Sequence, residues 1–118
     1  MVNISYNGFD NKVIAMESSS NIANGALVTI ASTGKCTQCT ANQEFIGVAV
    51  CKRDSVVSVQ VGGYVECKYT GTAPSKGYTR LKASAATTVV AASNDDYGIN
   101  KYKVLKVDET NKIVGFIL

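Results

Sequence analysis

Residues 56–69 have the sequence Val-Val-Ser-Val-Gln-Val-Gly-Gly-Tyr-Val-Glu-Cys-Lys-Tyr. On either side of Gly62 and Gly63, apolar side chains occupy every second position. This period of two is typical of a strand with one buried face. A glycine pair permits either a tight turn or a kink. The stretch therefore predicts a hairpin or one kinked strand.

The same alternation extends to both ends of the chain, and no segment has the three-and-four spacing of a long amphipathic helix. In residues 83–92 a helical turn and a strand both remain open. Gly47, inside an apolar run, indicates a bulge or a close approach of two backbones. The sequence therefore predicts an all-β fold with little helix, either a compact β-sandwich or a small β-barrel of about eight short strands. The expected strands outside the opening stretch are 12–16, 26–31, 45–51, 78–82 and a closing hairpin of 102–107 and 112–118 around a turn at 108–111.

The length of 118 residues predicts one domain with a hydrophobic core of its own. We expect residues 1–11 to form a flexible polar N-terminal arm and residues 12–118 a single β domain. The first residues lack the basic start and apolar stretch of a secretory signal, so none is expected. The chain has no run of about 18 apolar residues, so no transmembrane helix is expected.

The chain has no histidine, which removes the commonest general base and the commonest metal ligand. The acidic pairs Asp95-Asp96 and Asp108-Glu109 do not have the alternating spacing of a calcium loop, and solvated turns explain them. Neither glycine of the 62–63 pair opens a helix that could hold a phosphate. We therefore predict no catalytic, cofactor-binding or metal-binding residues and no cofactor, and we expect a protein that is not an enzyme.

The four cysteines are Cys36, Cys39, Cys51 and Cys67, and the first two form a Cys-x-x-Cys pair. Four thiolates could hold zinc, but a second pair is missing. Disulfides would suit an exported protein. The flanks of the pair indicate a loop, which disfavours a redox motif, and Cys51 and Cys67 fall in strands as small buried apolar residues. Free thiols are the favoured state, with zinc and disulfides left open.

The charge balance is modest, with 12 Lys and Arg against 9 Asp and Glu, a net charge of +3. Lys101, Lys103 and Lys106 form the densest basic group. They could contact nucleic acid or an acidic protein surface, or they could be the charged guard of an edge strand. Tyrosines beside cations, as in Tyr78-x-Arg80 and Tyr102-Lys103, could stack on bases in a nucleic-acid-binding β-barrel. Half-buried sheet faces and protein interfaces also explain them.

The order of these segments resembles the small head decoration (cement) proteins of tailed bacteriophages. The resemblance covers roughly residues 11–118, and the Cys-x-x-Cys pair and residues 83–96 depart from the family pattern. The segments that carry it are Asn-Gly-Ala-Leu-Val-Thr-Ile at 24–30, Phe-Ile-Gly-Val-Ala at 45–49, the opening stretch through Cys67, a Pro-x-x-Gly turn at 74–77 and Val-Gly-Phe-Ile-Leu at 114–118.

This resemblance implies a structural protein that binds the outer surface of a phage capsid and stabilises the head. It implies the major capsid protein as partner, a homotrimer, manufacture in the host cytoplasm and a final location on the virion. Edge strands and tyrosines are candidates for the contacts between protomers, and the arm of residues 2–11 is a candidate for a contact with the capsid that orders on binding. Nucleic acid is not the expected partner, and no contact with a membrane is expected. The alternative function is a small nucleic-acid-binding β-barrel.

Overall fold

The computed structural model describes residues 5–6, 8–19, 21–93 and 95–118, and these residues form ten strands and no helix. The predicted all-β class is therefore confirmed. Beyond the expected eight strands, residues 83–92 contribute β8, and β3 was missed because its segment was interpreted as a loop. The strands are β1 (Lys12–Glu17), β2 (Leu27–Ile30), β3 (Cys36–Gln38), β4 (Gly47–Arg53), β5 (Val56–Gly62), β6 (Tyr64–Tyr69), β7 (Gly77–Ala83), β8 (Thr88–Ala91), β9 (Lys101–Asp108) and β10 (Ile113–Ile117).

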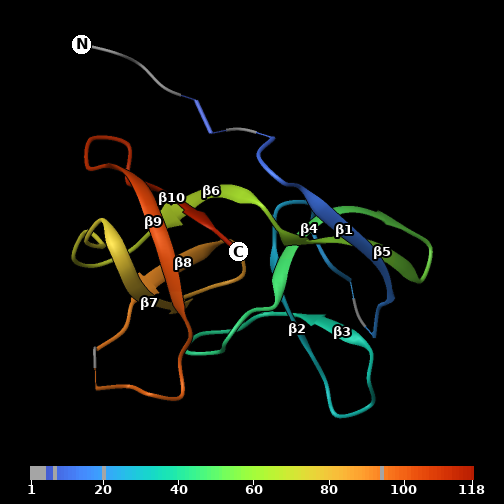
Figure 1. Cartoon of the computed structure of the whole chain (residues 1–118). Coiled ribbons are helices and arrows are strands. Elements are labelled where there is room, and N and C mark those ends of the chain that lie inside the picture. Colours follow the sequence, from blue (N-terminus) through green and yellow to red (C-terminus); the bar gives the residue numbers. More distant parts are fainter. Residues whose placement is uncertain (1–4, 7, 20, 94) are drawn as a thin grey trace.

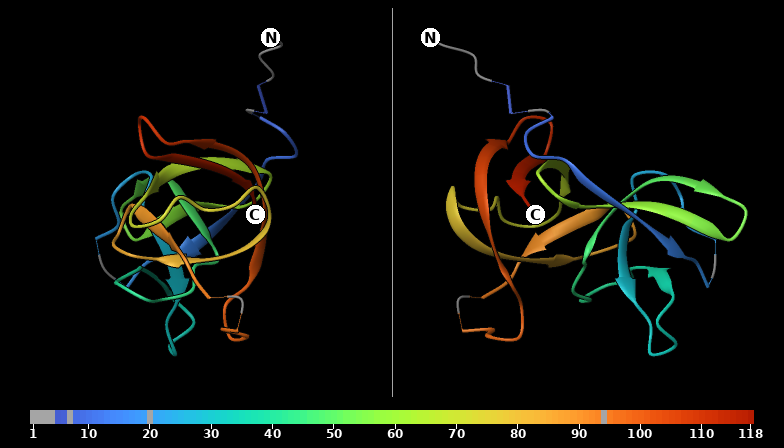
Figure 2. Two further views of the ribbon diagram at one scale, coloured as in Figure 1. Left: turned by 90° about the vertical axis from the view of Figure 1, so that its left-hand side faces the viewer. Right: turned by 45° about the vertical axis from the view of Figure 1, so that its right-hand side comes forward.

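The strands form two sheets that lie side by side along the 44 Å length of the molecule (Figures 1 and 2). The first sheet has the order β1-β5-β4-β2-β3. The second sheet, here called the barrel, closes on itself in the order β10-β6-β8-β7-β9. All pairs in the barrel are antiparallel except β6 with β8. The molecule thus combines an open sheet with a closed barrel.

The glycine pair at 62–63 is the point at which the chain passes from the first sheet into the barrel, because β5 ends at Gly62 and β6 begins at Tyr64. Gly63 has a φ of +90°, a conformation that side chains with a Cβ disfavour. A Cβ at this position would also lie 2.7 Å from the carbonyl oxygen of Asp10. The opening stretch is therefore a kinked strand rather than a hairpin.

Each sheet has its own hydrophobic core. In the first sheet, Val57 and Val59 of β5 are fully buried, as the alternation predicted. They pack with Ala49 and Val28 of the neighbouring strands and with Cys36. In the barrel, the inward positions of all five strands meet, and this core also holds three residues from the first half of the chain. The buried residues of the barrel core are Leu27, Cys39, Phe45, Val65, Tyr69, Leu81, Ala83, Val89, Val104, Val114 and Phe116.

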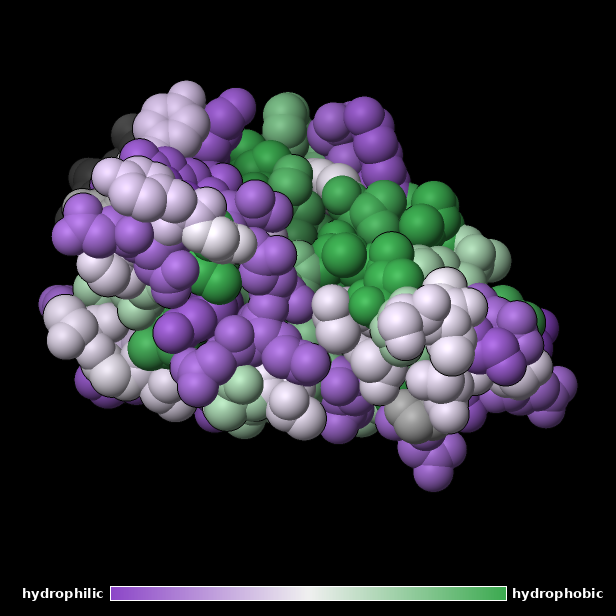
Figure 3. Space-filling view, turned by 90° about the horizontal axis from the view of Figure 1, so that it is seen from below, coloured by the Kyte–Doolittle hydropathy of each residue, from purple (hydrophilic) through white to green (hydrophobic). Residues whose placement is uncertain are grey.

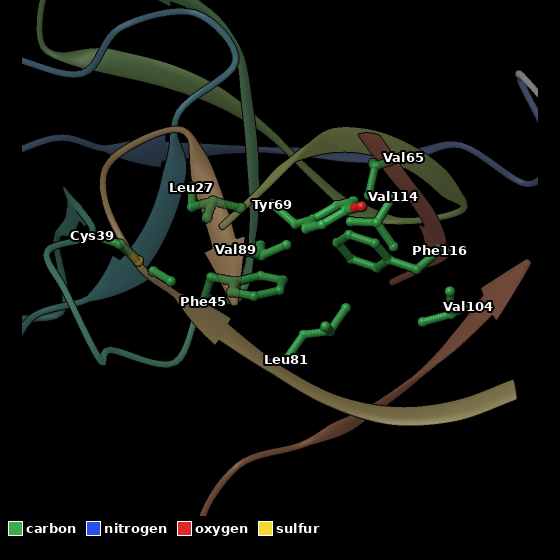
Figure 4. Packing of buried hydrophobic residues seen from close by; sticks show 11 residues of the cluster. Leu27, Cys39, Phe45, Val65, Tyr69, Leu81, Val89, Val104, Val114 and Phe116 are labelled. Carbon is green, nitrogen blue, oxygen red and sulfur yellow. The ribbon is translucent and has the colours of Figure 1, made fainter. Parts of the chain in front are cut away.

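The segment between β3 and β4 joins the two sheets. Phe45 points into the barrel (Figure 4), where its ring stacks on that of Tyr102 with 5.0 Å between centroids and lies 5.9 Å from that of Phe116. The backbone N–H of Asn42 donates to the carbonyl of Ala83 at 2.7 Å. This segment therefore covers one end of the barrel and ties it to the first sheet.

Two further predictions from the sequence are confirmed by the structure. β9 and β10 form the expected C-terminal hairpin. Gly47 lies so close to β5 that a Cβ would collide with the carbonyl oxygen of Gln60. The predicted close approach of two backbones thus lies between β4 and β5.

Candidate binding surfaces

β1 is the end strand of the first sheet and presents an open edge. β5 pairs with one side of it from Lys12 to Glu17, and no described strand pairs with the other side. Only beyond the strand does Ser18 bridge to Cys36 of β3. The main-chain hydrogen-bonding groups on the outer side of β1 therefore face solvent.

β1 exposes an apolar side chain on each of its two faces. Val13 is 53% exposed and Ile14 is 46% exposed. Successive strand residues point to opposite faces, so each face of β1 exposes an apolar side chain, although Met16 at the far end of the strand packs against the core of the first sheet. Figure 3 shows hydrophobic residues gathered over the half of the molecule that holds the first sheet. The other exposed apolar side chains of this sheet are Ile30, Val50 and Val56.

A hollow of about 640 Å³ lies at the β4–β5 hairpin and is lined by residues of the turn and of the adjoining ends of the two strands. Arg53 and Asp54 are its charged residues, and Cys51 contributes a thiol. Among the described residues, no three Cys, Asp or Glu side chains are grouped so as to hold a metal ion. The hollow brings together no arrangement to which we can assign a reaction.

The two cysteines of the Cys-x-x-Cys pair belong to different cores, Cys36 to that of the first sheet and Cys39 to that of the barrel. The flanks of the pair are turns and coil, as predicted, but Cys36 begins the short strand β3 and both cysteine side chains are buried. Burial raises the pKa of Cys36, partly offset by a backbone hydrogen bond, and raises the pKa of Cys39 to about 11. These thiols are therefore protonated at neutral pH and are poor nucleophiles.

The remaining cysteines differ from each other. Cys67, half-buried on β6, has its pKa raised to about 12 by burial. Cys51 is exposed on β4, so the prediction of a buried apolar role was wrong for this residue. No disulfide joins any of the four cysteines in this structure.

The barrel carries cations and a tyrosine on the outer face of β7, β9 and β10. Tyr78 pairs with Lys103 across β7 and β9, and Arg80 pairs with Lys101 one row further on. Lys103 also lies opposite Ile117 of β10. Directly opposed residues of a sheet share a face, so these five side chains form one surface, here called the cationic face.

Tyr102 does not belong to the cationic face. Its ring points into the barrel against Phe45 and Phe116, and its hydroxyl donates to the carbonyl of Phe45 at 3.2 Å. Adjacent residues of a strand point to opposite faces, so Tyr102 points into the barrel and Lys103 points outward. The two side chains of the predicted pair Tyr102-Lys103 therefore do not share a surface. Tyr78 and Arg80, two residues apart, do share a face.

Lys106 lies outside the cationic face and has an acidic partner. Its Nζ lies 3.5 Å from Oε2 of Glu66, which also accepts a 2.8 Å hydrogen bond from the hydroxyl of Tyr64. Burial and then this hydrogen bond raise the pKa of Tyr64, so its hydroxyl remains a donor. Lys106 is thus part of a neutralised group on β6 and β9.

Part of the predicted N-terminal arm lies outside the described residues, namely 1–4 and 7. Further along, the carbonyl of Phe9 accepts a hydrogen bond of 3.1 Å from the backbone N–H of Tyr64. The ring of Tyr6 lies 5.5 Å from that of Tyr64. The side chain of Phe9 is 56% exposed. These contacts attach the described end of this segment to the start of β6, and the boundary at residue 11 stays a prediction.

No helix long and apolar enough to cross a membrane occurs in the part of the chain that the structure describes. Comparison with known proteins finds no match to a family model, to a curated protein or to a solved structure.

Proposed function

We propose that this protein is a non-enzymatic structural protein that binds the outer surface of a phage capsid and stabilises the head. The observation that supports this function is the open, apolar edge of β1. Soluble proteins usually protect such an edge with charges, bulges or a covering segment. In this strand only Lys12 and Glu17, at its two ends, are charged. An uncovered strand of this kind is suited to lie against another protein.

The edge offers two kinds of contact to a capsid protein. A strand or extended segment of the partner can continue the first sheet beyond β1 through main-chain hydrogen bonds. The side chains of Val13 and Ile14 then bury apolar area on the two faces of the extended sheet. Main-chain pairing supplies affinity, and the alternating side chains supply specificity.

Stabilisation of the head follows from mass action. A protein that binds only the assembled, expanded shell stabilises that state by about 4 kcal/mol per site when its free concentration is a thousand times Kd. The major capsid protein is the proposed partner. The proposed location is the outside of the virion, after manufacture in the host cytoplasm.

The test is sedimentation of the protein with purified phage heads that were expanded without it. We expect the wild-type chain to sediment with the heads and Ile14→Lys to stay in the supernatant, because the lysine places a charge in the proposed interface. Ile30→Lys is the matched control, since Ile30 is a strand isoleucine of similar exposure, 51%, on β2. Binding by Ile14→Lys equal to that by Ile30→Lys would contradict the role of β1. Failure of the wild-type chain to sediment would contradict the function itself.

The oligomer implied by the resemblance is a homotrimer, and the exposed strand edge and tyrosines are its candidate contacts. Light scattering of the free protein should give three times the mass of one chain. A monomeric mass for Ile14→Lys, with a trimer for Ile30→Lys, would assign the β1 edge to contacts between protomers instead of contacts with the capsid.

A further inference from the structure

We propose that the cationic face of the barrel is a binding site for single-stranded nucleic acid. This function is separate from capsid binding, because the site lies on β7, β9 and β10 and the open edge lies on β1 of the other sheet. The proposal depends on the charge of this surface, on its exposed aromatic ring and on the hollow between them.

The cations on this surface face one another. Arg80 and Lys101 are directly opposed across β7 and β9, and like charges in this position destabilise a sheet. Arg80 is held by the carbonyl of Ile99, to which it donates, and by the ring of Tyr97, 5.2 Å from its guanidinium carbon. An anion bound across the two strands would relieve the repulsion between them.

Lys101 and Lys103, the two lysines of β9 on the cationic face, are the residues best placed to contact phosphate. Both are exposed, and the ion pairs of the described residues involve neither of them. They are two positions apart on one strand, so their side chains leave the same face about 7 Å apart. Among the described residues, the acidic side chain that pairs with a lysine of this strand is Glu66, and it pairs with Lys106.

The explanation of these lysines as the guard of an edge strand is wrong for this fold. β9 pairs with β7 on one side and with β10 on the other, so it has no free edge to protect. Their clustering therefore needs another explanation, and contact with an anion is the one that the sequence also allowed.

A hollow of about 340 Å³ lies between the lysines and the aromatic ring. Tyr78 lines it with 70% of its side chain exposed, and half-buried Ile117 and Leu118 give it an apolar part. Its size is at the lower end of the range for small-ligand sites. An aromatic ring, an apolar surface and flanking cations are the elements with which proteins bind a base and its phosphate.

The geometry favours a single strand over a duplex or an acidic protein. Stacking on Tyr78 needs a base whose face is free, and bases in a duplex are covered by their neighbours. The described residues contain no helix that could enter a major groove. An acidic protein would use the lysines but would gain little from the ring.

Fluorescence anisotropy of a short labelled oligo(dT) strand, titrated with the full chain at low salt, tests the proposal. We expect saturable binding that weakens as salt is added. For two phosphate contacts, a plot of the logarithm of the association constant against the logarithm of the salt concentration should have a slope of about −1.4. Lys101→Glu/Lys103→Glu should abolish binding, and Tyr78→Ala should weaken it about tenfold by removing the stacking surface. Both changes are at exposed positions, and circular dichroism would verify that the variants fold.

Lys68→Glu/Lys112→Glu is the matched control, because it makes the same change in net charge at exposed positions outside the hollow. It should keep most of the affinity. Equal loss in the two double variants would overturn the site, since net charge alone would then explain binding. Competition by polyglutamate or by duplex DNA as strong as that by oligo(dT) would overturn the assignment to single strands, and absence of binding by the wild-type chain would overturn the proposal outright.

Discussion

Gly47 fits its place in β4 because it has no side chain. The close approach of the β5 backbone leaves no room for a Cβ, which would meet the carbonyl oxygen of Gln60 and lie 2.8 Å from Cγ1 of Val59. The sequence indicated a bulge or close approach at this glycine, but only the pairing of β4 with β5 identified the neighbour.

At the residue scale we predict that Gly47→Ala destabilises the protein by about 1–3 kcal/mol through overpacking against the backbone of β5. The measurement is the midpoint of urea unfolding. Gly98→Ala is the control, because it adds the same methyl group where the nearest atom of another residue is 3.9 Å away. Equal midpoints for the two variants would show that β4 and β5 separate at little cost.

The cysteine pair illustrates the limit of inference from single residues. The Cys-x-x-Cys spacing suggested a shared site, but Cys36 and Cys39 point into different cores. A spacing of three residues brings side chains together on a helix but not on a strand that ends between two sheets. Nothing in the sequence indicated that the segment after β3 leaves the first sheet for the barrel.

At the scale of elements, the β9–β10 hairpin depends on its turn. Asp108 accepts hydrogen bonds from the side chain of Asn111 at 2.9 Å and from the backbone N–H groups of Asn111 and Thr110, both at 3.1 Å. These bonds hold the pKa of Asp108 below its ordinary value, and nearby Lys106 adds to the effect. The carboxylate form is thus favoured in the folded hairpin.

We predict that Asp108→Asn lowers stability at neutral pH and that the difference from wild type disappears in acid. A carboxyl group with a lowered folded pKa stabilises the protein above its unfolded pKa of about 3.9, and this contribution is lost as the pH falls through the folded value. Thermal unfolding at several pH values measures it. Asp95→Asn serves as the comparison, as this carboxylate lies in another turn. If the difference in stability between Asp108→Asn and wild type stayed constant down to acid pH, the charge of Asp108 would not be its cause, and the prediction would be wrong.

The strands that carry the two proposed surfaces were found from the sequence, but their positions in the sheets were not. Alternation predicted β1, β7 and β9 to within a few residues. It does not say which strand lies at an edge, since register and neighbours depend on the remote segments that pair. The structure places β1 at an open edge and β9 inside a closed barrel. The lysines of β9 therefore do not protect an edge strand, which was one of their two interpretations from the sequence.

At the scale of the whole molecule, the two sheets are joined through Phe45. It is 2% exposed and lies in the barrel core, although it lies in the segment between β3 and β4, two strands of the first sheet. The backbone bonds Asn42 to Ala83, Ala83 to Gln43 and Leu27 to Ala86 surround this contact. We therefore expect the two sheets to unfold together.

Phe45→Ala should cost about 3–5 kcal/mol and should destabilise both sheets, because it leaves a cavity at the contact between them. Far-ultraviolet circular dichroism and tyrosine fluorescence during urea unfolding measure this, because the strands of the barrel and their loops carry five of the six tyrosines and β1–β5 carry none. Phe9→Ala, at an exposed position, should change stability by no more than about 0.5 kcal/mol. Two separate transitions in wild type would refute the coupling.

The sequence by itself determined the all-β class, most of the strands, the close approach at Gly47 and the C-terminal hairpin, because each depends on local periodicity or on the conformational freedom of one residue. Tertiary structure decided which strands pair, that the chain divides into an open sheet and a closed barrel, and that Phe45 connects them. It also decided which cations share a face and which strand has a free edge. These features depend on contacts between segments that are remote in the chain. A period of two predicts a strand but does not identify the strand with which it pairs.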